Sequence, residues 1–156
     1  LSLATEYVWF YTPYLILGDA LFDAFIRAAK RGVDVRIIMP GIPDKKIPYA
    51  LAKTHYATLL DSGVKIYEYV PGFVHAKSFV CDDKIAVVGT INMDYRSLYL
   101  HFECGVLLYG CRAVREAQES FMTTLEKSRE ITAADCKSGM LRSIGRKILR
   151  LFAPLM

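Results

Sequence analysis

Strand-like and helix-like segments alternate along the first 70 residues, and no other feature constrains the fold as strongly. Residues 6–11 are rich in aromatic and β-branched residues, which favours a strand. An apolar helical face follows, with Asp19 predicted as the N-cap of the helix and Gly32 as its stop. Residues 33–39 then have the pattern of a buried strand. This part of the chain therefore predicts a β-α-β unit.

The rest of the chain extends this unit to a mixed sheet. A second helix, with Pro48 near its start and Gly63 after its end, leads to a strand at residues 64–70. The remaining predicted elements are a hairpin of residues 74–81 and 85–88, a strand at 102–109 and a helix at 112–130. The prediction is an α/β fold, in which helices pack on both faces of a mixed β-sheet.

Length and composition fit a single domain, residues 1–156. With 53% hydrophobic residues, the chain buries roughly two thirds of the surface that its unfolded form exposes. Its apolar runs fall far short of the stretch of about 20 residues that spans a bilayer, so we expect a soluble domain. Four cysteines without a Cys-x-x-Cys spacing favour a reduced, cytoplasmic setting. The first residue is Leu1 rather than Met, and we expect a piece of a longer protein.

The positive charge lies in the last 20 residues. The net charge is +4, but five of the 20 Lys and Arg residues fall from Lys137 onward, where there is no acid, and the residues before it are close to neutral. Residues 138–156 also place Leu and Ile on one helical stripe. This predicts a basic amphipathic helix suited to an anionic membrane surface. The alternative is a terminal helix that packs on the sheet and keeps its basic face in water.

Four polar side chains are predicted to converge after the second β-α unit. In an extended strand His75 and Lys77 project on the same side, about 7 Å apart. Thr90 and Asn92 have the same spacing beyond the hairpin. A neutral histidine is a competent nucleophile toward phosphorus, and an ammonium and an amide stabilise phosphoryl oxygens. This set requires no metal and no cofactor. The alternative is a solvated strand face.

Glu103 is a carboxylate inside the predicted apolar strand at 102–109, where an unpaired charge is costly. If it accepts the Nδ1 proton of His75, it fixes the tautomer of the imidazole and leaves Nε2 free to attack. Pairing with Arg96 or another cation is the alternative. Asp94 and Arg96 are predicted to form a structural ion pair or a helix cap.

These residues resemble the motifs of the phospholipase D superfamily. His75-x-Lys77-x4-Asp82 is similar to the HKD motif, Gly89-Thr90-Ile91-Asn92 is similar to the Gly-Ser/Thr-x-Asn element that follows it, and Glu103 falls where that superfamily has its histidine-orienting acid. The resemblance to the C-terminal half of bacterial cardiolipin synthases covers nearly the whole chain. Its segments are residues 12–14, 31–36, 63–67, 71–77 and 89–97. His101 departs from that pattern, because the family usually has asparagine there.

The resemblance implies a phospholipase D-like half-domain with α-β-α layers. It implies that two phosphatidylglycerol molecules become cardiolipin and glycerol through a phosphohistidine, with His75 as nucleophile or acid. Lys77, Thr90 and Asn92 would line the phosphate site, Glu103 would orient His75, and Asp82 would support the structure of the catalytic set.

The resemblance also implies partners and a location. The chain holds one HKD motif, so a second is expected in the parent chain or in a homodimer, with the parent at the cytoplasmic face of a bacterial membrane. Two alternatives remain. One is a phospholipase D-like nuclease or phosphodiesterase, although no basic stripe flanks His75 and nucleic acid is not expected. The other is an inactive structural half.

Overall fold

The computed structural model describes residues 1–136, and strands and helices alternate along the first 70 of them as predicted. The elements in chain order are β1 (Tyr7–Tyr11), α1 (Asp19–Lys30), β2 (Asp34–Pro40), α2 (Lys46–Asp61), β3 (Lys65–Tyr69), β4 (Ser78–Cys81), β5 (Ile85–Gly89), α3 (Tyr95–Tyr99), β6 (Gly105–Tyr109), α4 (Arg112–Leu125) and β7 (Ser128–Glu130). The predicted helix at 138–156 lies outside the described residues. Within residues 1–136, no helix is both long and apolar enough to cross a bilayer.

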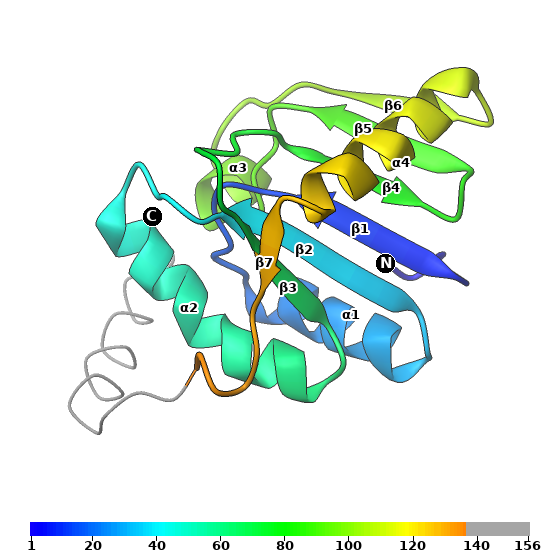
Figure 1. Ribbon diagram of the computed structural model, residues 1–156. Helices are drawn as coiled ribbons and strands as arrows, with labels where there is room; N and C mark the ends of the chain where they lie inside the picture. The colour runs from blue at the N-terminus through cyan, green and yellow to red at the C-terminus, as the bar shows by residue number, and fades with distance from the viewer. Residues whose placement is uncertain (137–156) are drawn as a thin grey trace.

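The seven strands form one mixed sheet in the order β6-β5-β4-β1-β2-β3-β7 (Figure 1). The three neighbouring strands β1, β2 and β3 run parallel to one another. Every other neighbouring pair is antiparallel, including the predicted hairpin of β4 and β5. The predicted α/β class with a mixed sheet is confirmed.

Two apolar clusters, one on each face of the sheet, form the core. Val8 of β1 lies in the first cluster with Phe25 of α1 and Leu59 of α2. Trp9 lies in the second cluster with Phe121 of α4. Because neighbouring residues of a strand point to opposite faces, β1 is buried along its whole length. Helices thus cover both faces, and α4 packs over β4 and β5 (Figure 1).

The start of α1 differs from the prediction. Its N-cap is Gly18, and no side chain caps the helix, whereas Asp19 is already the first helical residue. There its carboxylate lies in the first turn, where the helix dipole favours negative charge. Gly32 and Gly63 end the first two helices as predicted, both with positive φ angles of 90° and 95°.

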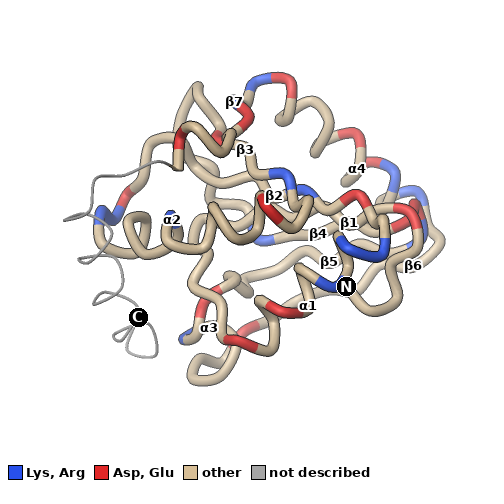
Figure 2. Tube along the Cα trace, turned by 90° about the horizontal axis from the view of Figure 1, so that it is seen from below, with Lys and Arg blue, Asp and Glu red and all other residues tan. Residues whose placement is uncertain are grey.

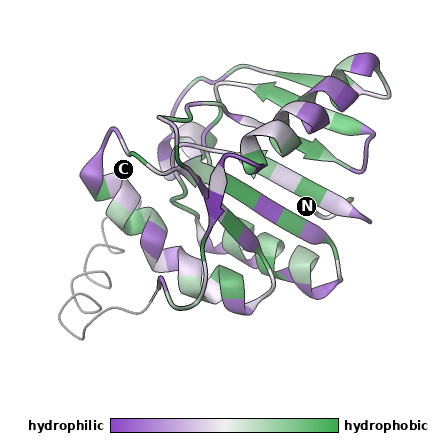
Figure 3. Ribbon diagram, viewed as in Figure 1, coloured by the Kyte–Doolittle hydropathy of each residue, from purple (hydrophilic) through white to green (hydrophobic). Residues whose placement is uncertain are grey.

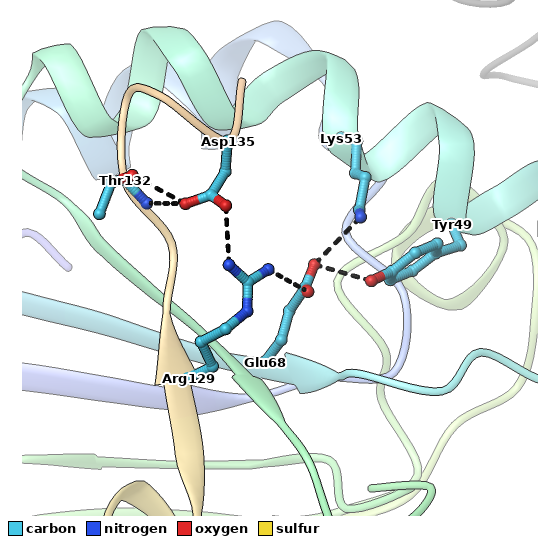
Figure 4. A network of polar contacts seen from close by, with 6 residues as sticks. All are labelled: Tyr49, Lys53, Glu68, Arg129, Thr132 and Asp135. Carbon is cyan, nitrogen blue, oxygen red and sulfur yellow. Dashed lines mark hydrogen bonds and ion pairs between the residues drawn. The ribbon is translucent and has the colours of Figure 1, made fainter. Parts of the chain in front are cut away.

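The helix predicted at residues 112–130 is too long, because α4 ends at Leu125 and residues 128–130 form strand β7. β7 pairs antiparallel with the otherwise open edge of β3. Figure 4 shows how the pairing is held: the buried Glu68 of β3 contacts Arg129 of β7 at 3.3 Å and Lys53 of α2 at 3.4 Å, and it accepts a hydrogen bond from Tyr49. Arg129 contacts Asp135 in turn, at 2.7 Å.

Two strands begin later than predicted. β4 starts at Ser78 rather than at residue 74, and β6 starts at Gly105 rather than at 102. His75, Lys77 and Glu103 therefore stand in the loops that lead into these strands. The cause for β4 is its neighbour β1, because the last pair between them is Tyr11 with Ser78 and the chain then turns away at Thr12-Pro13.

Candidate active site

Three loops meet at the end of the sheet where the parallel strand β1 finishes. The backbone N–H of Gly89 donates to the carbonyl of Lys77 at 3.1 Å, and the N–H of Thr90 donates to the carbonyl of Cys104 at 2.9 Å. A side chain at Gly89 would clash, because a Cβ there would lie 2.3 Å from the carbonyl oxygen of Cys104. The tight approach of β5 to β6 brings Lys77, Thr90 and Glu103 into one cluster.

Glu103 is held by Thr90 and not by His75. The Thr90 hydroxyl donates a short hydrogen bond to the Glu103 carboxylate and accepts one from the N–H of Cys104 at 3.0 Å. Hydrogen bonds from Thr90 and Ser97 lower the pKa of Glu103. The carboxylate also lies 3.8 Å from Nδ1 of His101. In the described chain no hydrogen bond joins Glu103 to His75, so the predicted pair is not formed in this structure.

Lys77 is a partly buried cation facing several carboxylates. Its ammonium donates to the carbonyl of His75 at 2.7 Å. Burial lowers the pKa of Lys77, and the negative charges of Glu103, Asp44 and Asp94 oppose that shift. The His75 side chain is exposed, with its ring 5.2 Å from that of Phe73.

The segment 90–94 is anchored to the loop after β1. The Thr12 hydroxyl accepts a hydrogen bond from the N–H of Met93 at 3.1 Å, and the carbonyl of Met93 accepts one from Ile16 at 2.8 Å. Asn92 donates through Nδ2 to the hydroxyl of Ser97 at 3.1 Å. Its Oδ1 is buried and has no hydrogen-bond partner in the described chain.

Asp94 is the N-cap of α3 and accepts a hydrogen bond from the N–H of Ser97 at 2.8 Å. The predicted cap is confirmed, whereas the ion pair between Asp94 and Arg96 is absent from the described contacts. Instead Nε of Arg96 donates to Nε2 of His101 at 3.3 Å. Arg96 does not pair with Glu103 either, and the imidazole of His101 lies beside that carboxylate instead.

A pocket of about 520 Å³ opens beside this cluster, between the start of α2 and α3. Asn92 is the only predicted site residue that lines it. Its wall is formed by Tyr14, Ile16, Lys45, Ile47, Pro48, Asn92, Asp94, Arg96, Ser97 and His101. Lys77 lines a smaller recess of about 40 Å³ with Gly89 and Ile91. Sequence reasoning missed Lys45 as a site residue, because it precedes the motif by more than 25 residues.

Asp82, predicted as part of the catalytic set, lies away from it. It follows β4, whereas Lys77 precedes the same strand, and its carboxylate accepts hydrogen bonds of 2.8 to 3.0 Å from Thr5, Glu6 and Tyr7. Burial would raise the pKa of Asp82, but these hydrogen bonds lower it to about 2. The geometry supports the predicted structural role of Asp82 and does not bring it into the cluster of Lys77, Thr90 and Glu103. Among residues 1–136 there is also no cluster of three His, Cys, Asp or Glu side chains suited to a metal ion.

Solved structures with the same fold include phospholipase D superfamily members. Nuc from Salmonella typhimurium, a phospholipase D family member, matches with a TM-score of 0.70 at 18% identity, over 83% of this chain and 84% of that one. Phosphatidylserine synthase from Haemophilus influenzae matches with a TM-score of 0.74 at 16% identity, over 98% of this chain and 40% of that one. At such low identity these matches show the fold.

Other relatives are more similar to this chain in sequence than these structures are. An uncharacterised protein of Streptococcus mutans is 52% identical over all of this chain and 34% of its own length. Cardiolipin synthase 2 of Bacillus cereus is 40% identical over 98% of this chain and 30% of its own length. The chain thus spans about a third of the relatives it matches. The family described as cardiolipin synthase, PLD-like domain, matches residues 1–125. The chain belongs to this family of phospholipase D-like domains.

Proposed function

We propose that the chain is one catalytic half of a phosphatidyltransferase that converts two phosphatidylglycerol molecules into cardiolipin and glycerol. The gathering of Lys77, Thr90 and Glu103 beside an exposed His75 carries this proposal. Family membership and relatives named cardiolipin synthase support the choice of lipid over other phosphodiesters.

The proposed reaction has two displacements at phosphorus. One HKD imidazole attacks the phosphorus of a phosphatidylglycerol; a P–N bond forms, the P–O bond to glycerol breaks, and the second HKD histidine gives its proton to the leaving oxygen. That histidine then takes the proton of a hydroxyl on a second phosphatidylglycerol, whose oxygen attacks phosphorus and releases the imidazole. Either role suits His75, because its imidazole is exposed and donates to no described residue.

Lys77 is proposed to neutralise the phosphoryl oxygens, and Glu103 to keep Lys77 charged. Burial of Lys77 favours its neutral form, and the carboxylate of Glu103 opposes this. The hydrogen bond from Thr90 keeps Glu103 itself ionised, because it lowers the pKa of the carboxyl group. This role of Glu103 differs from the one predicted from the sequence, in which Glu103 oriented His75. Bracing of His75 by Glu103 stays a prediction for the assembled site.

A second HKD-bearing unit is proposed to dock on exposed apolar residues of β6 and the loop before it. We call this group the apolar edge; it consists of Leu100, Phe102, Val106, Leu107 and Tyr109, all at least 58% exposed. Figure 3 shows apolar colouring along β5 and β6 at this side of the sheet. Exposed apolar groups on an edge strand mark an interaction surface. The relatives are about three times as long as the chain, which leaves room for such a unit in the parent protein.

The proposed substrate is anionic lipid at a membrane surface. The nucleic-acid alternative would require a basic stripe along the site. Lys and Arg residues of the described chain are instead interspersed with Asp and Glu (Figure 2). We therefore retain the lipid substrate.

The test is to incubate phosphatidylglycerol vesicles with the complete parent protein and, separately, with the chain alone. The complete protein is expected to release glycerol and form cardiolipin, and His75→Ala is expected to abolish both. The matched control is Lys30→Ala, an exposed residue at the end of α1. Cleaved DNA with intact lipid would overturn the proposal. Turnover by the chain alone would favour a homodimer over a parent half.

A further inference from the structure

The pocket between α2 and α3 has the chemistry of a glycerophosphate site. We propose that it binds the glycerophosphate headgroup of the second, accepting phospholipid; this rests on the proposed function. At about 520 Å³ the pocket is large enough for a ligand of this size. It is lined by Asn92 but not by His75 or Lys77, so it is a separate space from the recess that Lys77 lines.

Two cations on the pocket wall supply the attraction for a phosphate. Lys45 and Arg96 both line the pocket, and neither forms an ion pair with a carboxylate in residues 1–136. The acids nearest in sequence have other partners: Asp44 accepts a hydrogen bond from Tyr14 at 2.5 Å, and Asp94, which also lines the pocket, caps α3. An arginine with open N–H groups is suited to bidentate phosphate binding.

The position of Arg96 is defined by His101. Nε of Arg96 donates to Nε2 of His101, so this imidazole nitrogen is an acceptor and the proton of the neutral ring lies on Nδ1, the nitrogen that faces Glu103. The terminal N–H groups of Arg96 are left for a ligand. His101 is thus a positioning residue for Arg96.

Asn92 adds a preference for a hydroxyl group. Its Nδ2 donates to Ser97, while its Oδ1 is buried and accepts no hydrogen bond in the described part of the chain, so a ligand hydroxyl reaches this oxygen when the Asn92 side chain turns toward the pocket. An amide oxygen cannot bond to an unprotonated phosphate oxygen, but it accepts from an alcohol. A ligand with an anionic phosphate and a free hydroxyl matches both halves of the pocket. Ile47, 56% exposed, and Pro48 form an apolar rim along which acyl chains can leave.

The first experiment measures binding to the full 156-residue chain by calorimetry, with sn-glycerol 3-phosphate and inorganic phosphate as probes. Glycerol phosphate is expected to bind more tightly, because only its hydroxyls reach Asn92. Arg96→Gln is expected to weaken its binding about tenfold, while Arg115→Gln, a matched exposed arginine on α4, leaves binding unchanged. No saturable binding, or equal binding by Arg96→Gln and the unchanged chain, would overturn the proposal. Equal affinities for the two probes would remove Asn92 from the site.

The second experiment separates a lipid ligand from a soluble one. In the complete protein Arg96→Gln is expected to raise the KM for phosphatidylglycerol more than it lowers kcat. His101→Ala should do the same to a smaller degree, and His101→Asn, which keeps an acceptor, should restore part of the loss. An unchanged KM together with weakened glycerol phosphate binding would assign the pocket to a soluble phosphate. If the complete protein makes no cardiolipin but glycerol phosphate binding still depends on Arg96, the proposed function is rejected. The assignment of the pocket to a glycerophosphate then still stands.

Discussion

The Asp82 carboxylate joins the turn after β4 to the segment that leads into β1, and Asp82→Asn tests what this link contributes to stability. Asparagine keeps the size of the side chain but removes its charge, and it turns an NH₂ group toward backbone donors. The folded pKa of about 2 lies below the ordinary value of 3.8. The stabilisation is therefore fully present above about pH 4 and is lost as the pH falls through about 2.

The magnitude follows from the size of this shift. A change from 3.8 to about 2 corresponds to about 2.4 kcal/mol at about 1.36 kcal/mol per pH unit. Because Asp82 is partly exposed, solvent screening reduces this value, and we expect about 1 to 1.5 kcal/mol at pH 7. The same linkage predicts that the difference between the two proteins falls to about half of its pH 7 value at pH 3.

Urea unfolding followed by Trp9 fluorescence measures this difference. Trp9 is the only tryptophan, is 6% exposed, and stacks on Phe121 at 5.1 Å, so its emission reports on the core. Asp23→Asn is the control, because Asp23 and Arg27 are both more than 60% exposed and such pairs contribute less than about 0.5 kcal/mol. A loss for Asp82→Asn that stays constant from pH 7 to pH 3 would refute the reasoning.

Two further substitutions test the pairing of β3 with β7 and the proposed docking at the apolar edge. Glu68→Ala should lower the free energy of unfolding by about 2 kcal/mol, because it leaves Tyr49, Lys53 and Arg129 without their shared acceptor. A free energy from urea unfolding within about 0.5 kcal/mol of that of the unchanged chain would contradict this. Leu107→Lys should leave the stability of the chain unchanged and abolish cardiolipin synthesis by the complete protein. The control Leu3→Lys, at a similarly exposed position, should leave synthesis intact. Full activity of Leu107→Lys would argue against docking at the apolar edge.

The central part of the fold was predictable because local signals and tertiary packing agree there. Gly32 and Gly63 mark helix ends through backbone conformation alone, and the apolar runs of β1 and β2 are buried on both faces. β7 has no such signal, since Ser128-Arg129-Glu130 carries no apolar alternation. It is a strand because the outer edge of β3 offers unpaired backbone groups.

The site was predictable as a set of residues but not as a set of contacts. Spacing alone placed His75, Lys77 and Glu103 on strands, whereas strand ends depend on the neighbouring strands, which no local pattern records. The choice of Thr90 over His75 as partner of Glu103 depends on how closely two loops approach. Lys45 reaches the pocket from the start of α2, and no motif links it to residue 92.

Gly89 ties the packing of the sheet to the loops of the candidate site. Even a methyl group there would meet the Cys104 carbonyl at 2.3 Å, so a larger residue must push β5 and β6 apart. The same displacement would pull the Thr90 hydroxyl from the Glu103 carboxylate. Anyone redesigning the chemistry of this chain can vary the polar groups at positions 90 and 103, but the glycine beside them must be inherited unchanged.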